Sequence, residues 1–159
     1  MTSPAGDPGP EADAGWAIVA ARTRELTEGP LAGWRSFPEG WDPFRDLAGP
    51  FGFRRLSDGQ IEAGFWPGPP HCDGSGQVSS RALAAFVDFC AIDLSRPARA
   101  PHHAVTLSAQ IAHFAPAQAG ALISATAAVS GTRYWLVSGA MVQRGDLVAR
   151  FQVMLALVR

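Results

Sequence analysis

The sequence contains no lysine and no asparagine, and all 13 of its basic residues are arginine. Against them stand 14 acidic residues, so the net charge at pH 7 is −1, without the basic excess typical of nucleic-acid-binding domains. There are only two cysteines, Cys72 and Cys90, and they form no CxxC pair. This spacing indicates neither a zinc site nor a disulfide framework.

Long apolar runs are also missing. No segment approaches the roughly 20 apolar residues that a membrane span requires, and the N-terminus lacks the basic start and apolar run of a secretory signal. The four histidines show no metal-ligand spacing apart from the adjacent pair His102 and His103, which would point to opposite faces of a strand. We therefore expect a cytoplasmic protein with no metal, no cofactor, and no nucleic-acid or membrane partner.

A chain of 159 residues has the length of one domain with a substantial core. Residues 1–10 are rich in proline and glycine, and we expect them to be disordered. Residues 11–28 predict a helix that Gly29-Pro30 ends. Residues 30–50 are irregular and contain aromatics that we expect to dock onto a domain: Trp34, Phe37, Trp41 and Phe44. Residues 1–45 are thus treated as an N-terminal segment and residues 46–159 as the domain.

The stretch His71–Leu94 joins a glycine-containing loop to a helix. Ser79 is a good N-cap, because its hydroxyl can accept a hydrogen bond from a free N–H of the first turn. Apolar residues then occupy more of the helix than one narrow stripe, at positions 82, 83, 86, 87, 89, 90 and 94. Such a helix should be largely covered, yet Asp88 lies in its middle. That carboxylate must be paired, exposed along a thin seam, or chemically active.

Strand patterns surround this helix. Two short strands precede it, at 51–56 and 60–66, and after a linker at Arg96–Pro101 four more follow, at 105–113, 121–129, 133–143 and 147–158. The alternation in 105–113 predicts one covered face. Strands joined by short turns form an antiparallel meander. The order predicts an α+β fold with a sheet of about six strands curled around a central helix, about Ser80–Leu94, plus an extra N-terminal helix.

The loop before the central helix and the helix itself resemble a known protein family. The run Asp73-Gly-Ser-Gly-Gln-Val-Ser79-Ser80-Arg81, followed by Asp88, resembles the PaaI-like acyl-CoA thioesterases of the phenylacetate pathway, which have the hotdog fold. The pattern of that family is Asn, a Gly three residues later, His-Gly-Gly, and an Asp nine residues after the His. Gly76 and Asp88 keep this spacing without a gap. The strand from Val105 to Ala117 is also similar, and the resemblance covers about 110 residues from roughly Leu47 onward.

The resemblance implies catalytic roles for four positions. Asp88 would activate or orient water, or would itself attack the thioester carbonyl, and Thr106 on the following strand would help to hold the water. The thioester oxygen would be bound at Asp73 and by the backbone N–H of Ser80. The site would be completed across a dimer interface, with the helix Asp of one subunit facing the loop of the other. Candidate substrate-binding residues are Ser79, Arg81, Gly76 and His71.

The sequence departs from the family pattern where Ser79-Ser80-Arg81 replaces His-Gly-Gly and Asp73 replaces Asn. Ser80 still offers an N–H at a helix N-terminus, which suits a developing oxyanion. An ionised Asp73 would repel that oxygen, and a loop Asp before Gly also has a plain role in turns. Arg81 could pair with Asp88, which lies seven residues along the same helix face, or with Asp73. Thr106 could be simply the polar face of a strand.

We therefore expect a homo-oligomeric hotdog thioesterase, a dimer or a dimer of dimers, that hydrolyses an acyl-CoA or acyl-carrier thioester through water activated by Asp88. The alternative is a catalytically silent hotdog protein that binds an acyl thioester or a protein partner. The loss of His-Gly-Gly favours the alternative. The presence of Asp88, Thr106 and Gly76 favours the enzyme.

Overall fold

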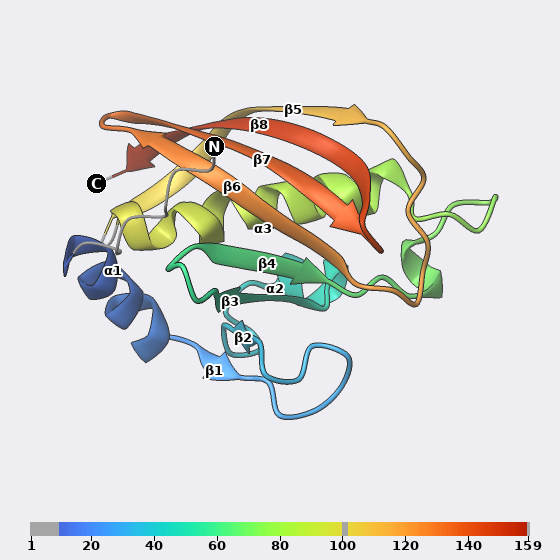
Figure 1. Ribbon diagram of the computed structural model, residues 1–159, viewed down its shortest axis with the longest axis horizontal. Coiled ribbons are helices and arrows are strands. Elements are labelled where there is room, and N and C mark those ends of the chain that lie inside the picture. The colour runs from blue at the N-terminus through green and yellow to red at the C-terminus, as the bar shows by residue number, and fades with distance from the viewer. Residues whose placement is uncertain (1–9, 100–101, 159) are drawn as a thin grey trace.

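The computed structural model describes residues 10–99 and 102–158, and shows one antiparallel sheet curled around a long helix (Figure 1). The strands are β1 (Arg24–Glu25), β2 (Arg35–Ser36), β3 (Phe51–Arg55), β4 (Ile61–Phe65), β5 (His103–His113), β6 (Ile123–Gly131), β7 (Tyr134–Gln143) and β8 (Asp146–Val158). Their order in the sheet is β1-β2-β3-β4-β6-β7-β8-β5. The helices are α1 (Pro10–Ala21), α2 (Pro43–Ala48), α3 (Ser80–Arg99) and a short 3-10 turn, η1 (Pro69–His71). The predicted α+β hotdog architecture is confirmed.

The central helix α3 supplies most of one side of the core. Phe86, Phe89 and Cys90 are buried, as predicted, and Phe86 packs against Phe51 and Phe65 from the sheet with ring centroids 5.6 and 5.5 Å apart. Burial raises the pKa of the Cys90 thiol well above its usual range, so this cysteine acts as an apolar core residue. The helix is held in place because the apolar side chains of both helix and sheet are removed from water where the two meet.

The helix is longer than predicted, because the expected linker at Arg96–Pro101 is helical as far as Arg99. Pro97 removes one backbone N–H from the last turns. Near it, two side chains of the helix donate hydrogen bonds to backbone carbonyl oxygens: Ser95 Oγ donates to Ala91 O at 2.6 Å, and Arg99 Nη2 donates to Ile92 O at 2.8 Å. Arg99 is buried, and this burial lowers the pKa of its guanidinium to about 10. The helix continues past its proline, where Gly15 of α1 lies against Pro97.

The N-terminal part of the chain adds two strands that the sequence did not predict, so the sheet has eight strands rather than about six. The predicted helix 11–28 ends at Ala21, because Arg24 and Glu25 pair with β2 instead. The Arg35 side chain fixes this turn: its Nε donates to Thr23 Oγ1 at 3.0 Å. Residues 1–9, most of the tail expected to be disordered, lie outside the described residues. The division at 45/46 remains a prediction.

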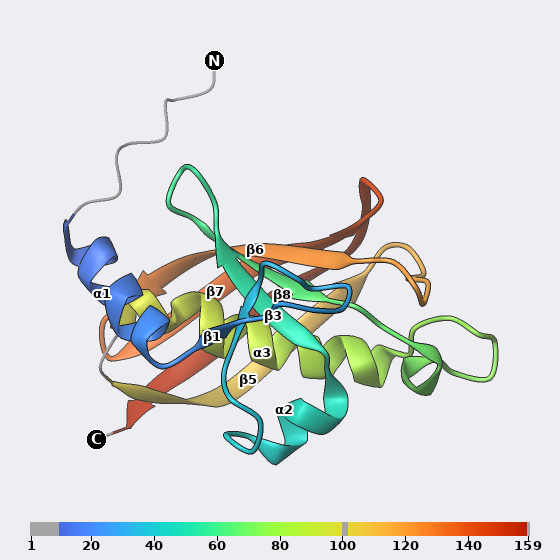
Figure 2. The same ribbon diagram turned by 90° about the horizontal axis from the view of Figure 1, so that it is seen from below.

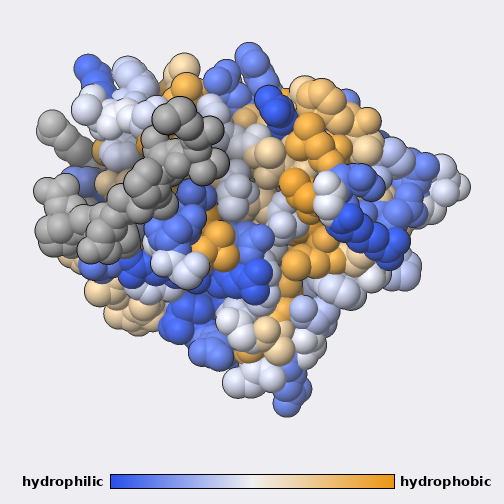
Figure 3. All heavy atoms as spheres, viewed as in Figure 1, coloured by the Kyte–Doolittle hydropathy of each residue, from blue (hydrophilic) through white to orange (hydrophobic). Residues whose placement is uncertain are grey.

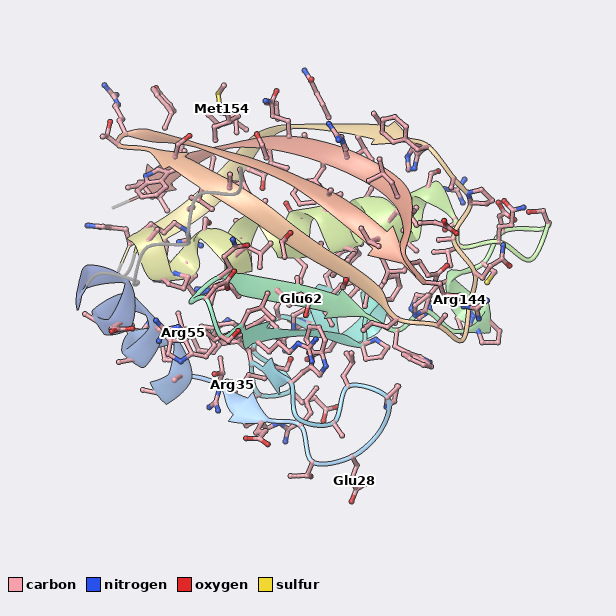
Figure 4. The ribbon with its side chains drawn as sticks, viewed as in Figure 1. Glu28, Arg35, Arg55, Glu62, Arg144 and Met154 are labelled. Atoms are coloured by element: carbon pink, nitrogen blue, oxygen red, sulfur yellow. The ribbon has the colours of Figure 1, made fainter. Side chains whose placement is uncertain are left out.

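Strand β5 forms one edge of the sheet, and it is unusually bare. Although the alternation predicted one covered face, Val105 and Leu107 remain 45% and 52% exposed in the single chain. A register shift between Thr106 and Ser108 places Leu107 at a β-bulge. Met154 on the neighbouring β8 points away from α3 (Figure 4). On the face seen in Figure 3, hydrophobic residues gather over part of the sheet among hydrophilic ones.

None of the helices within residues 10–99 and 102–158 combines the length and the hydropathy that crossing a membrane requires.

The aromatic part of the N-terminal segment packs into the domain. Trp34 is 5% exposed, and its ring lies so close to Gly64 of β4 that a Cβ at Gly64 would come within 2.6 Å of it. Arg54 also packs on this ring, with its guanidinium carbon 4.4 Å from the centroid. Phe37 likewise belongs to the hydrophobic core.

We therefore expect Trp34→Ala to lower the free energy of unfolding by roughly 3–5 kcal/mol, because it leaves a cavity above β4. Trp41, which is 52% exposed, is the matched control, and Trp41→Ala should change stability by about 1 kcal/mol or less. Urea unfolding of both variants measures the difference. Equal losses would show that residues 30–45 are not anchored through Trp34.

Candidate functional site

Asp88 lies on an exposed seam of α3, although the helix is otherwise mostly covered. The β5 edge strand passes beside this seam, and Thr106 Oγ1 donates a hydrogen bond to Asp88 Oδ1 at 2.7 Å. The two residues are 18 positions apart, so the contact exists only because β5 returns along the helix. The second carboxylate oxygen, Oδ2, makes no hydrogen bond to the described residues and is available to water or substrate.

A pocket opens beside this carboxylate, between α3 and the N-terminal segment. The volume of this pocket is about 80 Å³. Asp88 lines it together with apolar and charged side chains: Phe37, Trp41, Phe44, Phe51, Ala85, Phe89, Ile92, Asp42, Arg45, Asp93 and Arg96. Seen from below, α2 lies beside α3 and forms the outer side of this region (Figure 2). A polar group with a free oxygen at the edge of an apolar pocket is a typical arrangement for a small-molecule site.

The loop before α3 carries Asp73 and Gly76 and projects from the body of the molecule (Figure 1). Asp73 Oδ1 accepts hydrogen bonds from Ser75 Oγ at 2.6 Å and from Ser75 N at 2.8 Å. These bonds lower the pKa of Asp73, with the Ser75 hydroxyl as the main cause. Asp73 is therefore held as a carboxylate in a turn, and in that state it cannot donate a hydrogen bond to a thioester oxygen.

His71 and Gly76 fix the shape of the same loop. The His71 ring accepts a hydrogen bond from Gly68 N at 2.9 Å and packs edge-on against Phe65, with centroids 5.1 Å apart. Gly76 has a φ of +80°, a left-handed conformation that residues with a Cβ adopt with strain. Within the single chain both residues have a structural task, and their predicted substrate contacts stay predictions.

The start of α3 confirms Ser79 as its N-cap, because Ala82 N donates to Ser79 Oγ at 3.2 Å and Leu83 N donates to Ser79 O at 3.1 Å. Ser80 is the first helical residue, is exposed, and its N–H has no acceptor among the described residues. Arg81 is also exposed and forms no ion pair with Asp88 or Asp73 within the described part of the chain. Neither of the two pairings considered for Arg81 is present in the protomer.

The structure brings Asp88 and Thr106 together but separates them from the other candidates. Ser80 and Asp88 are eight residues apart on one helix, which corresponds to about 12 Å along the axis. A single thioester carbonyl cannot reach both the Ser80 N–H and water on Asp88 of the same chain. Within the protomer the Ser80 N–H and the Asp88 carboxylate therefore lie in separate places on α3. The described residues contain no cluster of His, Cys, Asp or Glu placed to hold a metal ion.

The sequence did not predict that residues of the N-terminal segment line the pocket beside Asp88. Phe37, Trp41 and Phe44 were expected to dock, but not beside Asp88. Arg45 and the buried pair Asp93–Arg96, 2.9 Å apart, were not singled out at all. The available signal was the density of aromatic residues among prolines and glycines, which marks a docked segment but does not say where it docks.

The structure matches solved structures across most of the chain, whereas no protein-family profile and no curated protein matches the sequence. An asparagine-to-aspartate mutant of the phenylacetic acid degradation protein PaaI from Thermus thermophilus is 28% identical, with 74% of this chain and 100% of that chain covered and a TM-score of 0.62. The E. coli PaaI protein is 14% identical over 94% of both chains, with a TM-score of 0.67. A hypothetical thioesterase of Streptococcus pneumoniae, crystallised with coenzyme A, is 11% identical over 68% of this chain and 88% of that chain, with a TM-score of 0.60. The chain thus shares the hotdog fold of PaaI and of hotdog thioesterases.

The conformation of the loop before α3 can be tested at Gly74 and Gly76. A Cβ at Gly74 or at Gly76 would meet open space, but only Gly76 has a positive φ. Gly76→Ala should therefore destabilise the protein by roughly 1–2 kcal/mol or reshape the loop. Gly74→Ala should be neutral or slightly stabilising. Thermal unfolding and amide exchange of residues 73–79 measure both effects, and similar behaviour of the two variants would contradict the turn assigned to Gly76.

Proposed function

We propose that this protein hydrolyses an acyl thioester, an acyl-CoA or a related acyl-carrier thioester, with Asp88 as the residue that activates water. The observation that carries the proposal is the carboxylate of Asp88, held at one oxygen by Thr106 and free at the other, at the edge of an apolar pocket. The likeness to PaaI, and to a thioesterase that was crystallised with coenzyme A, supports this class of substrate.

In the proposed reaction a water molecule lies on Asp88 Oδ2, while the bond from Thr106 keeps the carboxylate oriented. Asp88 accepts a proton from this water as the water oxygen attacks the thioester carbonyl. The carbon–sulfur bond then breaks, the sulfur leaves as a thiolate, and the thiolate takes up a proton. Thioester and water are thereby converted into a carboxylic acid and a free thiol.

The negative charge that develops on the carbonyl oxygen needs a donor. The N–H of Ser80 at the N-terminus of α3 suits this role, because it has no acceptor among the described residues and lies at the positive end of the helix dipole. Since this N–H and Asp88 of one chain are about 12 Å apart, we assign the donor to a second copy of the chain. The projecting loop and the exposed apolar residues of β5, Val105 and Leu107, offer the surface for such a dimer.

A silent binding protein is the second candidate, and Arg81 favours it. Arginine stands where the PaaI-like pattern has glycine, and in this structure its side chain is exposed at the start of α3. In a dimer this bulky cation would lie at the entrance to the thioester site. There it could bind a phosphate of the ligand, or it could block the approach of water.

Asp88→Asn should abolish turnover, with a loss on the order of 10²–10⁴-fold, because the amide cannot accept the proton of the attacking water. A panel of acyl-CoA substrates, followed by release of free thiol, measures the activity, and circular dichroism should show an unchanged fold. Calorimetry with acyl-CoA distinguishes the two candidates. Binding without thiol release by the wild type would identify the silent binder.

Ser80→Pro tests the oxyanion donor. Proline is well tolerated at the first position of a helix and removes only the N–H in question, so we expect kcat to fall by roughly 10²–10³-fold. Ser80→Ala keeps the N–H and should stay close to the wild type.

The same variant tests the shared site. If each site uses Ser80 of one subunit and Asp88 of the other, refolding an equal mixture of Ser80→Pro and Asp88→Asn chains should restore part of the activity, since one site of a mixed dimer is intact. A mixture as inactive as its two components would contradict a site built from two chains. Sedimentation at micromolar concentration provides the accompanying measurement, and a monomer there would contradict it as well.

A further inference from the structure

Strand β5 places two polar side chains on its face that is turned toward α3. Residues directly opposite each other on antiparallel neighbours share one face of the sheet. Thr106 lies opposite Leu155 of β8, which is fully buried, and it bonds to Asp88. His113, the last residue of β5, lies opposite Ala149, which is also fully buried. The His113 ring therefore lies on the same side of the strand as the Thr106 hydroxyl, and the proposed reaction gives it no role.

The end of β5 lies beside the start of α3. Val78 N donates to Ala117 O at 2.9 Å, which joins the loop before the helix to the segment that follows the strand. A surface cavity of about 400 Å³ opens here, and both Ser80 and His113 line it. The other residues of its wall are mostly apolar: Gln77, Val78, Leu83, Phe114, Ala115, Pro116 and Ala117. The histidine thus shares a cavity with Ser80, seven residues along β5 from Thr106.

The thioester oxygen needs a second donor in this chain. Asp73, which the family resemblance assigns to this oxygen, is a carboxylate bonded to Ser75 and cannot donate. Three of the described residues around the cavity have side chains that can donate, Gln77, Ser80 and His113. His113 alone of these can carry a positive charge, and charged donors form the stronger hydrogen bonds to an oxyanion. Its ring makes no hydrogen bond or ion pair with the described residues, so its N–H is available.

We propose that His113 is a further catalytic residue, whose ring N–H donates a hydrogen bond to the thioester carbonyl oxygen beside the N–H of Ser80. This inference rests on the proposed function. As water adds to the carbonyl carbon, the oxygen becomes negative and both donors stabilise the charge. When the carbon–sulfur bond breaks, the carbonyl forms again and the imidazole keeps its proton. Oxyanion binding then belongs to one chain, through Ser80 and His113, and water activation belongs to Asp88 of the other.

His113→Leu should lower kcat for thiol release by roughly 10²-fold and change KM little, because the lost hydrogen bond is stronger in the transition state than in the ground state. His113→Gln keeps a neutral N–H donor and should recover part of the loss. The matched control is His103→Leu, which removes a histidine from the other end of β5, outside the cavity, and should behave like the wild type. A kcat of His113→Leu equal to that of the control would overturn the proposal.

Refolded mixtures show on which side of the shared site His113 acts. A mixture of His113→Leu and Asp88→Asn chains should recover activity, because one site of the mixed dimer combines an intact Asp88 with an intact Ser80 and His113. A mixture of His113→Leu and Ser80→Pro should stay inactive, because each of its sites lacks one of the two donors. The reverse pattern, with recovery only in the Ser80→Pro mixture, would place His113 with Asp88 and contradict the assigned role.

Calorimetry separates this inference from the proposed function. The probe is a ketone analogue of an acyl-CoA in which a methylene replaces the thioester sulfur, so that it cannot be hydrolysed. If the wild type releases no thiol, roughly tenfold weaker binding of the ketone by His113→Leu than by His103→Leu would sustain the hydrogen bond from His113 and refute hydrolysis. Equal binding by these variants in that case would refute both. Thiol release by the wild type with the same kcat in both variants would refute the role of His113 alone.

Discussion

The hydrogen bond between Asp88 and Thr106 exists because helix α3 both buries apolar side chains under the sheet and carries a carboxylate at a place that the sheet leaves uncovered. Helix α3 must bury apolar side chains on most of its surface, because the sheet curls around it and the core consists largely of that contact. A carboxylate can be tolerated on such a helix only where the covering structure leaves a gap. That gap lies between the β5 edge and the N-terminal segment, and the bond from Thr106 Oγ1, 2.7 Å long, gives the carboxylate a fixed orientation there.

A comparison of two aspartates on α3, Asp88 and Asp93, shows how the covering of the helix changes the state of a carboxylate. Asp93 lies five residues beyond Asp88 but is buried, and burial raises the pKa of its carboxyl against the opposing effect of Arg96. Its Oδ1 is engaged by Arg96 of the same helix. Asp88 is exposed and keeps one oxygen open. The covering of the helix, and not the residue type, separates a structural carboxylate from one that is available for chemistry.

The N-terminal segment changes the character of the site. Without it α3 would face solvent along the seam, and Asp88 would be one surface carboxylate among several. With Phe37, Trp41 and Phe44 in place, Asp88 lines a pocket together with apolar and charged side chains. The proposed dimer rests on the exposed apolar residues of β5 and on the separation of about 12 Å between Ser80 and Asp88 of one chain.

The sequence by itself determined the α+β class, the buried face of the central helix and the N-cap at Ser79, because these follow from local periodicity and capping chemistry, while the hotdog assignment came from the family resemblance. It also determined the spacing between Asp73, Gly76 and Asp88. Only the tertiary structure decided that β1 and β2 join the sheet, since two-residue strands have no period to detect, and that α3 continues past Pro97 to Arg99, where Gly15 of α1 packs against the proline. It alone made Arg45 and Asp88 line one pocket: the two are 43 positions apart in the sequence, and no local pattern encodes where a docked segment meets a helix.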